Sequence, residues 1–234
     1  MGGQNVKNTM VERLLDLAAP HLCLGCGKEG RLVCDNCKYD ISFDPFVGCI
    51  LCGRPQRRGV CDDHAAPFVS AYVASSRSGV VKALLDNLKF HNAKAAAKCL
   101  AEILDQRAPY FPSDAIIVPI PTSSAHRRER GYDQTDLIAR HFAHLRNLRI
   151  EYMLRRTDNA VQHMVGRRQR ADQACHAYAL GFGKHVTPGR YYIILDDIIT
   201  TGATVTEASR LITEAGGIVA VVAGAYQALG GDEV

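Results

Sequence analysis

The sequence lacks tryptophan, and aromatic residues make up only 7% of its 234 positions. It also lacks any apolar run near the roughly 18 residues needed to cross a bilayer, and its first residues do not form the apolar segment of a secretory signal. We therefore expect no membrane insertion and a cytoplasmic location. The formal net charge is only +4, so overall charge does not predict a nucleic-acid partner.

Basic residues are nonetheless concentrated in three short clusters. Local positive potential, rather than net charge, is what attracts an anionic ligand or a nucleic-acid backbone. The clusters are Arg127, Arg128 and Arg130, then Arg155 and Arg156, then Arg167, Arg168 and Arg170. An anionic partner is therefore expected, although charge alone does not distinguish a small phosphate compound from nucleic acid.

Cysteine shows the clearest pattern, because seven of the nine cysteines lie between residues 23 and 61. They form C-x-x-C hooks, the last completed by a histidine at C-x-x-H spacing, and two hooks supply the four N or S ligands of a structural zinc. Disulfides and iron–sulfur ligation are alternatives, but a reducing compartment favours metal. The second zinc depends on His64, for which a surface position is the alternative. The expected ligands are Cys23, Cys26, Cys34 and Cys37 at the first zinc, and Cys49, Cys52, Cys61 and His64 at the second.

The chain divides into three parts by composition. Residues 1–20 carry apolar residues at helical spacing and predict a short lead-in helix that ends at Pro20. Residues 21–66 contain too few apolar residues for a core of their own, so bound metal would fold them. Residues 67–234 alternate between strand-like and helix-like segments, which predicts an α/β domain with a mostly parallel sheet and helices on both faces.

The expected elements of the α/β domain follow from apolar runs and periodicity. A helix over 78–108 is expected to be either long or broken. Strands are expected at 69–76, 114–121, near 149–156, at 191–197 and at 217–226, and further helices at 124–145 and 206–217.

The most specific stretch is IILDDIITTGAT at 193–204, where an apolar strand leads into Asp196 and Asp197 and then into small residues. Ligands of parallel sheets bind beyond the carboxyl ends of the strands. A loop of small residues before a helix leaves backbone N–H groups free and favours a phosphate. The two carboxylates need a different partner, either ribose hydroxyls or magnesium. The stretch therefore predicts a sugar-phosphate site, and capping of the following turn by Asp196 and Asp197 is the alternative.

Residues 193–204 resemble the phosphoribosyl pyrophosphate loop of type I phosphoribosyltransferases, and further segments make the chain similar to the ComF family. These segments are the paired metal hooks and residues 88–91, 118–121, 130–134 and 156–178. The resemblance implies two structural zinc ions in a double zinc ribbon, followed by a type I phosphoribosyltransferase-like domain. It also implies phosphoribosyl pyrophosphate with magnesium as ligand, and handling of single-stranded DNA in natural transformation.

The resemblance also implies roles for individual residues. Asp196 and Asp197 would be the catalytic carboxylates and face the ribose hydroxyls and magnesium. The 5-phosphate would contact Thr200, Thr201, Gly202, Ala203 and Thr204, and the pyrophosphate would contact Arg127 or Arg130, with Lys89 as a further cation. Residues 156–178 would form a hood over the sugar, in which Gln162, Arg167 and Arg170 match the family. Gln173 and Asp133 stand where the family usually has asparagine, so fine specificity is expected to differ.

Three functions are compatible with these features. The first is a DNA-handling protein of the transformation pathway, with tentative DNA contacts at Arg128, Arg156, Arg167, Arg170 and Tyr132. The second is an active phosphoribosyltransferase on a small nitrogenous acceptor, although no acceptor pocket is evident from the sequence. The third is a binding module that senses phosphoribosyl pyrophosphate while its zinc ribbons dock to a DNA helicase or another protein. The sequence supports the site better than the reaction.

Overall fold

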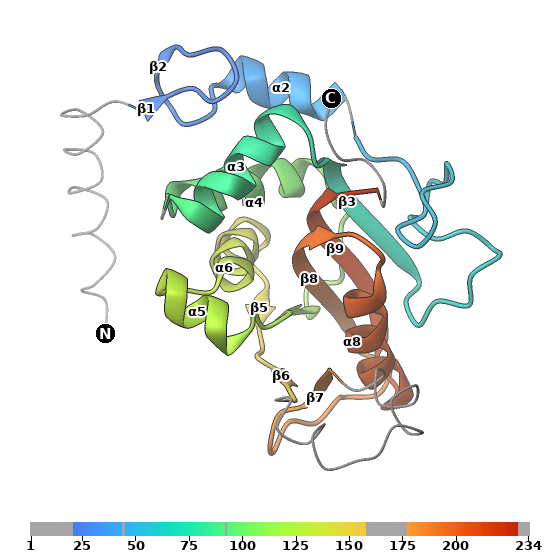
Figure 1. Ribbon diagram of the computed structural model, residues 1–234. Helices are drawn as coiled ribbons and strands as arrows, with labels where there is room; N and C mark the ends of the chain where they lie inside the picture. The colour runs from blue at the N-terminus through green and yellow to red at the C-terminus, as the bar shows by residue number, and fades with distance from the viewer. Residues whose placement is uncertain (1–20, 44, 92, 158–176, 229–234) are drawn as a thin grey trace, which may run out of the picture.

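The computed structural model describes residues 21–43, 45–91, 93–157 and 177–228 (Figure 1). The predicted lead-in helix at 1–20 lies outside the described residues. So do the predicted hood and DNA-contact residues Gln162, Arg167, Arg168, Arg170 and Gln173.

A five-stranded parallel sheet forms the centre of the described chain (Figure 1). Its three central strands, at 116–119, 191–199 and 218–226, consist mainly of β-branched and small apolar residues, as expected for strands that are buried on both faces. Every neighbouring pair is parallel, in the order β3-β9-β8-β4-β5, so the predicted parallel sheet is confirmed. The strands are β3 (Ser70–Ser76), β4 (Ile116–Pro119), β5 (Arg149–Ile150), β8 (Tyr191–Ile199) and β9 (Ile218–Tyr226).

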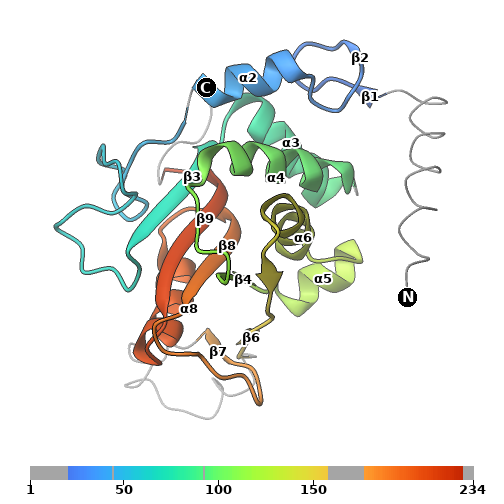
Figure 2. The same cartoon turned by 180° about the vertical axis from the view of Figure 1, so that it is seen from behind.

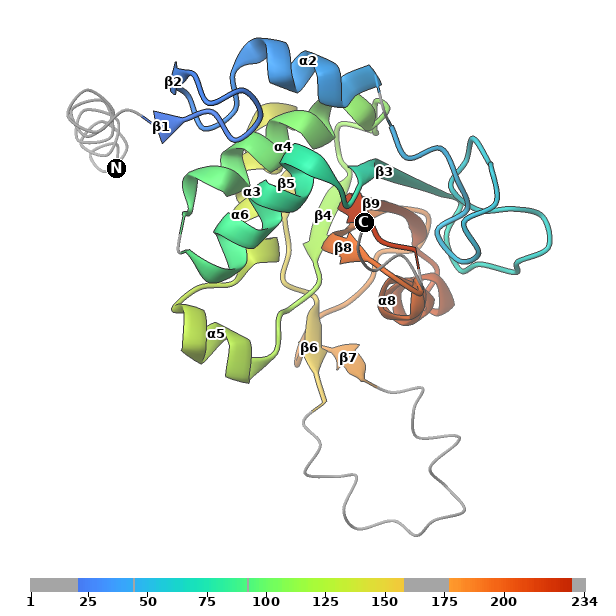
Figure 3. The same ribbon diagram turned by 45° about the horizontal axis from the view of Figure 1, so that its top comes forward.

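Helices cover both faces of this sheet (Figure 3). Successive residues of a strand face opposite sides, and β8 shows this clearly. Ile193 and Leu195 join the apolar core under α3, α4 and α6, whereas Tyr192 and Ile194 join the core under α8. The helices are α3 (Gly79–Phe90), α4 (Ala95–Arg107), α6 (Gln134–Arg146) and α8 (Ala203–Glu214).

Two predicted helices are each divided into two. The segment at 78–108 breaks after His91 into α3 and α4. The helix expected at 124–145 is wrong as a single element, because Gly131 takes the left-handed conformation (φ 77°) and ends α5 (Ser124–Arg130). Asp133 then caps α6 by accepting a hydrogen bond from the Asp136 N–H at 3.2 Å. The break places the N-terminus of α6 beside the end of β4.

The metal-binding segment contains β1 (His21–Leu22), β2 (Glu29–Gly30) and α2 (Asp35–Phe43), followed by irregular chain. Its first part packs through Val33 on the face covered by α3, α4 and α6, and its second part packs through Ile50 on the face covered by α8; both side chains are fully buried. The strand expected near 149–156 is two strands, β5 and β6 (Leu154–Arg156), and β6 pairs antiparallel with β7 (Tyr178–Leu180). Among the described residues, no helix combines the length and apolar character needed to span a membrane.

Candidate functional site

A cleft of about 220 Å³ lies at the carboxyl ends of β4 and β8, the edge of a parallel sheet where ligands bind. Its walls come from the end of β8, the loop after β4, the ends of α3 and α5, the starts of α6 and α8, and the β6–β7 pair. The charged and polar residues that face it include Lys89, Thr122, Arg130, Arg156, Asp196 and Asp197. The cleft therefore brings together residues that are more than 100 positions apart in the sequence.

Asp196 and Asp197 lie inside β8, which continues to Ile199 beyond the predicted end of the strand. Each carboxylate accepts a hydrogen bond from the next backbone N–H: Asp197 N donates to Asp196 Oδ1 at 2.8 Å, and Ile198 N donates to Asp197 Oδ1 at 2.9 Å. These bonds hold both carboxylates in defined orientations. Both residues line the cleft, so local turn capping is not their sole role.

Lys89, at the end of α3, forms an ion pair with Asp197, with Nζ 2.9 Å from Oδ2. Both side chains are less than one-fifth exposed. Burial, and secondly the charge of Asp197, raise the pKa of Asp196 well above its usual value, while Lys89 opposes this shift. The carboxylate pair is therefore short of positive charge. Such a site suits hydroxyl donors or a hard divalent cation such as magnesium, which prefers oxygen ligands.

The predicted phosphate loop follows directly. Thr200 and Thr201 are exposed, Gly202 takes the left-handed conformation (φ 73°), and α8 begins at Ala203. The helix thus starts three residues earlier than the predicted 206, so Ala203 and Thr204 form its first turn. The first N–H groups of a helix have no intrahelical partner and carry partial positive charge. Of the five predicted loop residues, Thr204 lines the cleft.

The loop after β4 forms the opposite wall and is tied to α6 by Asp133. The Thr122 backbone N–H donates to Asp133 Oδ2 at 2.9 Å, and the Thr122 hydroxyl donates to Asp133 Oδ1 at 3.2 Å. Asp133 therefore caps α6 and orients the loop at the same time. This contact gives a physical role to one of the two positions at which the chain departs from the family pattern.

The predicted basic and aromatic residues lie in different places. Arg130 and Arg156 line the cleft, whereas Arg127 and Arg128 are exposed on α5 and are not part of its lining. Tyr132 is half-buried, and its hydroxyl donates to the Leu88 carbonyl oxygen between α3 and α6. This hydrogen bond gives Tyr132 a packing role, and its contact with DNA stays a prediction.

Gln134, Thr135 and Tyr178 also line the cleft. Sequence reasoning assigned no role to Thr135, whereas Gln134 belongs to the family-matching segment 130–134 and Tyr178 to the predicted hood at 156–178. Gln134 is only 1% exposed, and its Nε2 has no hydrogen-bond partner among the described residues. Its Oε1 lies 3.5 Å from the Thr122 hydroxyl. A buried unpaired amide donor is costly unless a ligand or water satisfies it. Gln134 was part of the family-matching segment 130–134, but it was expected inside a continuous helix, so its place in the cleft was not predicted.

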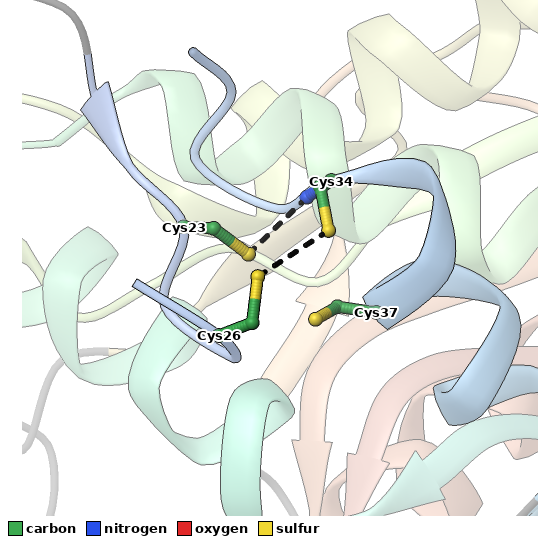
Figure 4. Close-up of side chains that lie close together, drawn as sticks. All are labelled: Cys23, Cys26, Cys34 and Cys37. Carbon is green, nitrogen blue, oxygen red and sulfur yellow. Dashed lines mark hydrogen bonds between the residues drawn. The ribbon is translucent and has the colours of Figure 1, made fainter. Parts of the chain in front are cut away.

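Two clusters that could hold metal ions, called the first and the second metal centre below, lie outside the cleft. In the first, the sulfur atoms of Cys23, Cys26, Cys34 and Cys37 converge (Figure 4), and all four lie within 4.8 Å of one another. Cys26 Sγ and Cys34 Sγ are 3.7 Å apart. A zinc tetrahedron with Zn–S bonds of about 2.3 Å has S···S edges of about 3.8 Å, whereas a disulfide bond is about 2.05 Å long. This geometry is compatible with zinc.

The second centre contains Cys49, Cys52, Cys61 and His64, whose ligand atoms also lie within 4.8 Å of one another. Cys52 Sγ is 3.8 Å from Cys61 Sγ, and His64 Nδ1 is 3.8 Å from Cys49 Sγ and 2.9 Å from Cys61 Sγ. The structure therefore points His64 into the cluster and does not leave it as a separate surface side chain. Both clusters could hold a metal ion.

The fold and the cleft define a class of protein: a parallel α/β domain with a polar cleft, preceded by two clusters of four residues that could each hold a metal ion. Over most of its length this chain is homologous to proteins named for competence or DNA utilization. It is 25% identical over 217 residues to the DNA utilization protein YhgH of Escherichia coli O6:H1, covering 86% of this chain and 94% of the relative. It is 23% identical over 212 residues to competence protein F of Haemophilus influenzae, covering 86% and 88%.

A third relative is competence protein ComFC of Bacillus subtilis, which is 26% identical over 201 residues and covers 81% of each chain. These similarities confirm the resemblance to the ComF proteins that the sequence motifs indicate.

Solved structures that resemble the chain include two crystal forms of a hypoxanthine phosphoribosyltransferase from Staphylococcus aureus. The tetragonal form gives a TM-score of 0.33 at 14% identity, covering 57% of this chain and 62% of the enzyme. The orthorhombic form gives 0.35 at 12%, covering 61% and 76%. These scores are too low to carry an argument, and no family model matches the chain.

Proposed function

We propose that this chain is a ComF-type protein that binds phosphoribosyl pyrophosphate with magnesium, and single-stranded DNA, during DNA uptake for natural transformation. The observation that carries the proposal is the cleft, in which two carboxylates, the first turn of a helix and two arginines surround one volume. The names of curated relatives, competence protein F and ComFC, support the uptake role. A cytoplasmic location is part of the proposal, because the metal centres need reduced thiols.

Each part of the sugar phosphate has a matching group in the cleft. The N-terminus of α8, with Thr204, offers donors for the 5-phosphate. Asp196 and Asp197 would accept hydrogen bonds from the ribose hydroxyls and would hold magnesium together with ligand oxygens. Arg130 and Lys89 would face the diphosphate. The planar guanidinium group of Arg130 can donate two hydrogen bonds to a pair of phosphate oxygens, and the Lys89 ammonium group adds positive charge. When bound, magnesium would neutralise the charge that builds up on the diphosphate.

Exposed aromatic rings beside arginines support the DNA part of the proposal. Phe90 is 68% exposed, and the Arg130 guanidinium lies 5.9 Å from its ring centroid. Phe182 is 93% exposed, and the Arg155 guanidinium lies 5.1 Å from its ring centroid. Single-stranded DNA binds where bases stack on aromatic rings and cations follow the backbone. Because Arg130 also lines the cleft, DNA and the sugar phosphate are expected to compete for it.

Calorimetry of the intact protein with phosphoribosyl pyrophosphate, with and without magnesium, tests the proposal. We expect binding in the micromolar range that depends on magnesium. Fluorescence anisotropy with a single-stranded oligonucleotide should show an affinity that falls steeply with salt, and that falls again when the sugar phosphate is added. Absence of sugar-phosphate binding would contradict the ligand assignment. An affinity for the oligonucleotide that does not change with salt concentration would contradict the DNA assignment.

The metal centres are proposed to hold zinc, and the expected content is about two zinc ions per chain, one for each four-ligand cluster. Elemental analysis of the purified protein measures it. Cys26→Ser and Cys52→Ser each remove one exposed ligand from a different cluster, so each variant should lose about one ion. Bound iron with visible absorbance, or zinc content that is unchanged in both variants, would contradict the assignment.

Gln134→Leu should weaken binding of phosphoribosyl pyrophosphate about tenfold. A hydrogen bond to a charged group contributes roughly 1.5–3 kcal/mol, and the unpaired Gln134 amide is the buried donor that faces the cleft. The ligand-free protein should be at least as stable as the wild type, because the substitution removes an unsatisfied donor. Calorimetry and thermal unfolding measure the two effects. Gln134→Glu, which places a like charge beside the anion, should bind less well than Gln134→Leu; equal affinity in all three proteins would remove Gln134 from the site.

A further inference from the structure

The second metal centre touches the predicted phosphate loop directly. Between its two ligands Cys49 and Cys52 lie Ile50 and Leu51, which face Gly202. A β-carbon added at Gly202 would lie 2.5 Å from Leu51 Cδ2 and 3.2 Å from the Ile50 carbonyl oxygen. Gly202 is buried as a result, and its left-handed conformation is the one from which α8 begins. The turn before the helix is therefore covered by the metal-binding hook.

The hook is itself anchored to the edge of the sheet. The Ile50 backbone N–H donates to the Gly59 carbonyl oxygen at 2.9 Å, and the Ala71 N–H of β3 donates to the Arg58 carbonyl oxygen at 2.8 Å. Gly59 packs so closely on Ala71 that no larger residue fits there. Figure 2 shows the irregular chain between α2 and β3, which carries the second metal centre, beside β3 at the edge of the sheet. The hook thus connects the sheet edge to the phosphate loop.

A second set of contacts reaches the same loop through Tyr226, at the end of β9. The Phe46 ring stacks on the Tyr226 ring with centroids 4.0 Å apart. A β-carbon at Gly53, one residue after the hook, would lie 3.3 Å from the Tyr226 hydroxyl. The next residue, Gln227, donates its backbone N–H to the Ile199 carbonyl oxygen at 2.9 Å. Because Ile199 directly precedes the loop, Tyr226 and Gln227 connect the segment that carries the second cluster indirectly to the start of the loop.

The first metal centre is built in the same way but contacts a different part of the fold. A β-carbon at Gly25 would meet Cys37 Sγ at 2.7 Å and Val80 Cγ2, on α3, at 3.1 Å. Lys38 on α2 forms an ion pair with Glu102 on α4. These contacts lie on the face of the sheet that α3, α4 and α6 cover, opposite to the face that α8 covers. The first centre therefore offers a matched internal control for the second.

We propose that the second metal centre positions the phosphate loop, with Ile50 and Leu51 as positioning residues for the sugar phosphate. Metal ligation by Cys49 and Cys52 would hold the hook, and the hook holds the left-handed turn at Gly202 and thereby the backbone N–H groups in the first turn of α8, of which the Ala203 N–H donates to Thr201 Oγ1 at 3.2 Å. Loss of the hook would release these donors from the arrangement that binds an anion. The identity of the ligand rests on the proposed function, whereas the coupling between hook and loop does not.

The test compares Leu51→Ala with Leu24→Ala. Both leucines lie between the two cysteines of a C-x-x-C hook, both are half-buried against an apolar core, and neither variant removes an expected metal ligand. Leu51→Ala should weaken phosphoribosyl pyrophosphate binding about tenfold and speed amide hydrogen exchange at residues 199–205, because binding donors lose their fixed positions. Leu24→Ala should leave both at wild-type values. Zinc content, which should stay unchanged in both variants, shows that the metal centres persist.

Equal affinity and equal exchange in the two leucine variants would overturn the proposal. Cys52→Ser adds a second measurement: exchange at 199–205 should rise more in this variant than in Cys26→Ser at matched loss of zinc. Equal exchange in those two variants would also count against the coupling. If the wild type binds no sugar phosphate, the proposed ligand is wrong, and the exchange comparison still decides whether the hook positions the loop.

Discussion

Asparagine at both Asp196 and Asp197 is expected to lower the affinity for phosphoribosyl pyrophosphate at least about 100-fold. Each carboxylate would accept a charge-assisted hydrogen bond from the ribose, and such bonds contribute roughly 1.5–3 kcal/mol each. Asparagine keeps the size of both side chains but removes the charge that holds magnesium. Calorimetry with saturating magnesium measures the loss. An affinity within threefold of the wild type would show that the two carboxylates do not bind the ligand.

The single variants should change the stability of the ligand-free protein in opposite directions. Burial raises the pKa of Asp196 in the folded state above the unfolded value of about 3.9, so the folded state binds this proton more tightly. The favourable contribution is complete below the unfolded pKa and is lost as pH rises through the folded pKa. At neutral pH, above the unfolded pKa, Asp196 therefore costs stability, and Asp196→Asn should unfold at a higher temperature than the wild type.

Asp197→Asn should instead lower the unfolding temperature, because Lys89, 18% exposed, loses the partner 2.9 Å from its Nζ. Thermal unfolding between acidic and neutral pH measures both effects, and each kcal/mol corresponds to about 2–4 °C for a chain of this size. The gain in Asp196→Asn should vanish at acidic pH, where both states of the wild type bind the proton. If Asp196→Asn unfolds at a lower temperature than the wild type at neutral pH, burial of the Asp196 side chain does not lower the stability of the protein.

The features that sequence predicts well are those that depend on neighbouring residues. Continuous β-branched runs predicted the long strands β8 and β9, because only a sheet covered on both faces buries such runs. The C-x-x-C spacing predicted both metal clusters, because a short turn suffices to bring two thiols to one ion. The run from Asp196 to Thr204 predicted a junction between a strand and a helix, and in the structure β8 ends and α8 begins within this run.

The features that sequence did not predict depend on contacts between distant segments. Lys89 meets Asp197 because the end of α3 lies against the end of β8, an arrangement that no local pattern encodes. Gln134 enters the cleft because Gly131 ends one helix and Asp133 begins the next, whereas the periodicity over 124–145 suited a single helix. The metal-binding segment was predicted as one module, yet Val33 and Ile50 pack on opposite sides of the sheet.

Gly202→Ala is expected to lower phosphoribosyl pyrophosphate affinity about 100-fold and to destabilise the protein by about 2–5 kcal/mol. The left-handed conformation costs an alanine about 1–2 kcal/mol, and crowding in a packed site costs about 1–3 kcal/mol more. The expected loss of affinity follows because the new methyl group would push the turn away from Leu51 and the Ile50 carbonyl. Chemical denaturation and calorimetry measure the two quantities.

Gly189→Ala separates backbone strain from crowding at the hook. Gly189 has nearly the same conformation (φ 75°), nothing lies within 4 Å of its added β-carbon, and it precedes β8 at the end opposite the cleft. Gly189→Ala should therefore lose only the stability that the left-handed conformation costs an alanine, and it should keep the wild-type affinity for phosphoribosyl pyrophosphate. Combining Gly202→Ala with Leu51→Ala should restore part of the stability lost in Gly202→Ala, since the shortened side chain removes the clash with Cδ2. Strictly additive stability losses would mean that Leu51 does not press on the turn, and that the metal hook and the phosphate loop are independent structures.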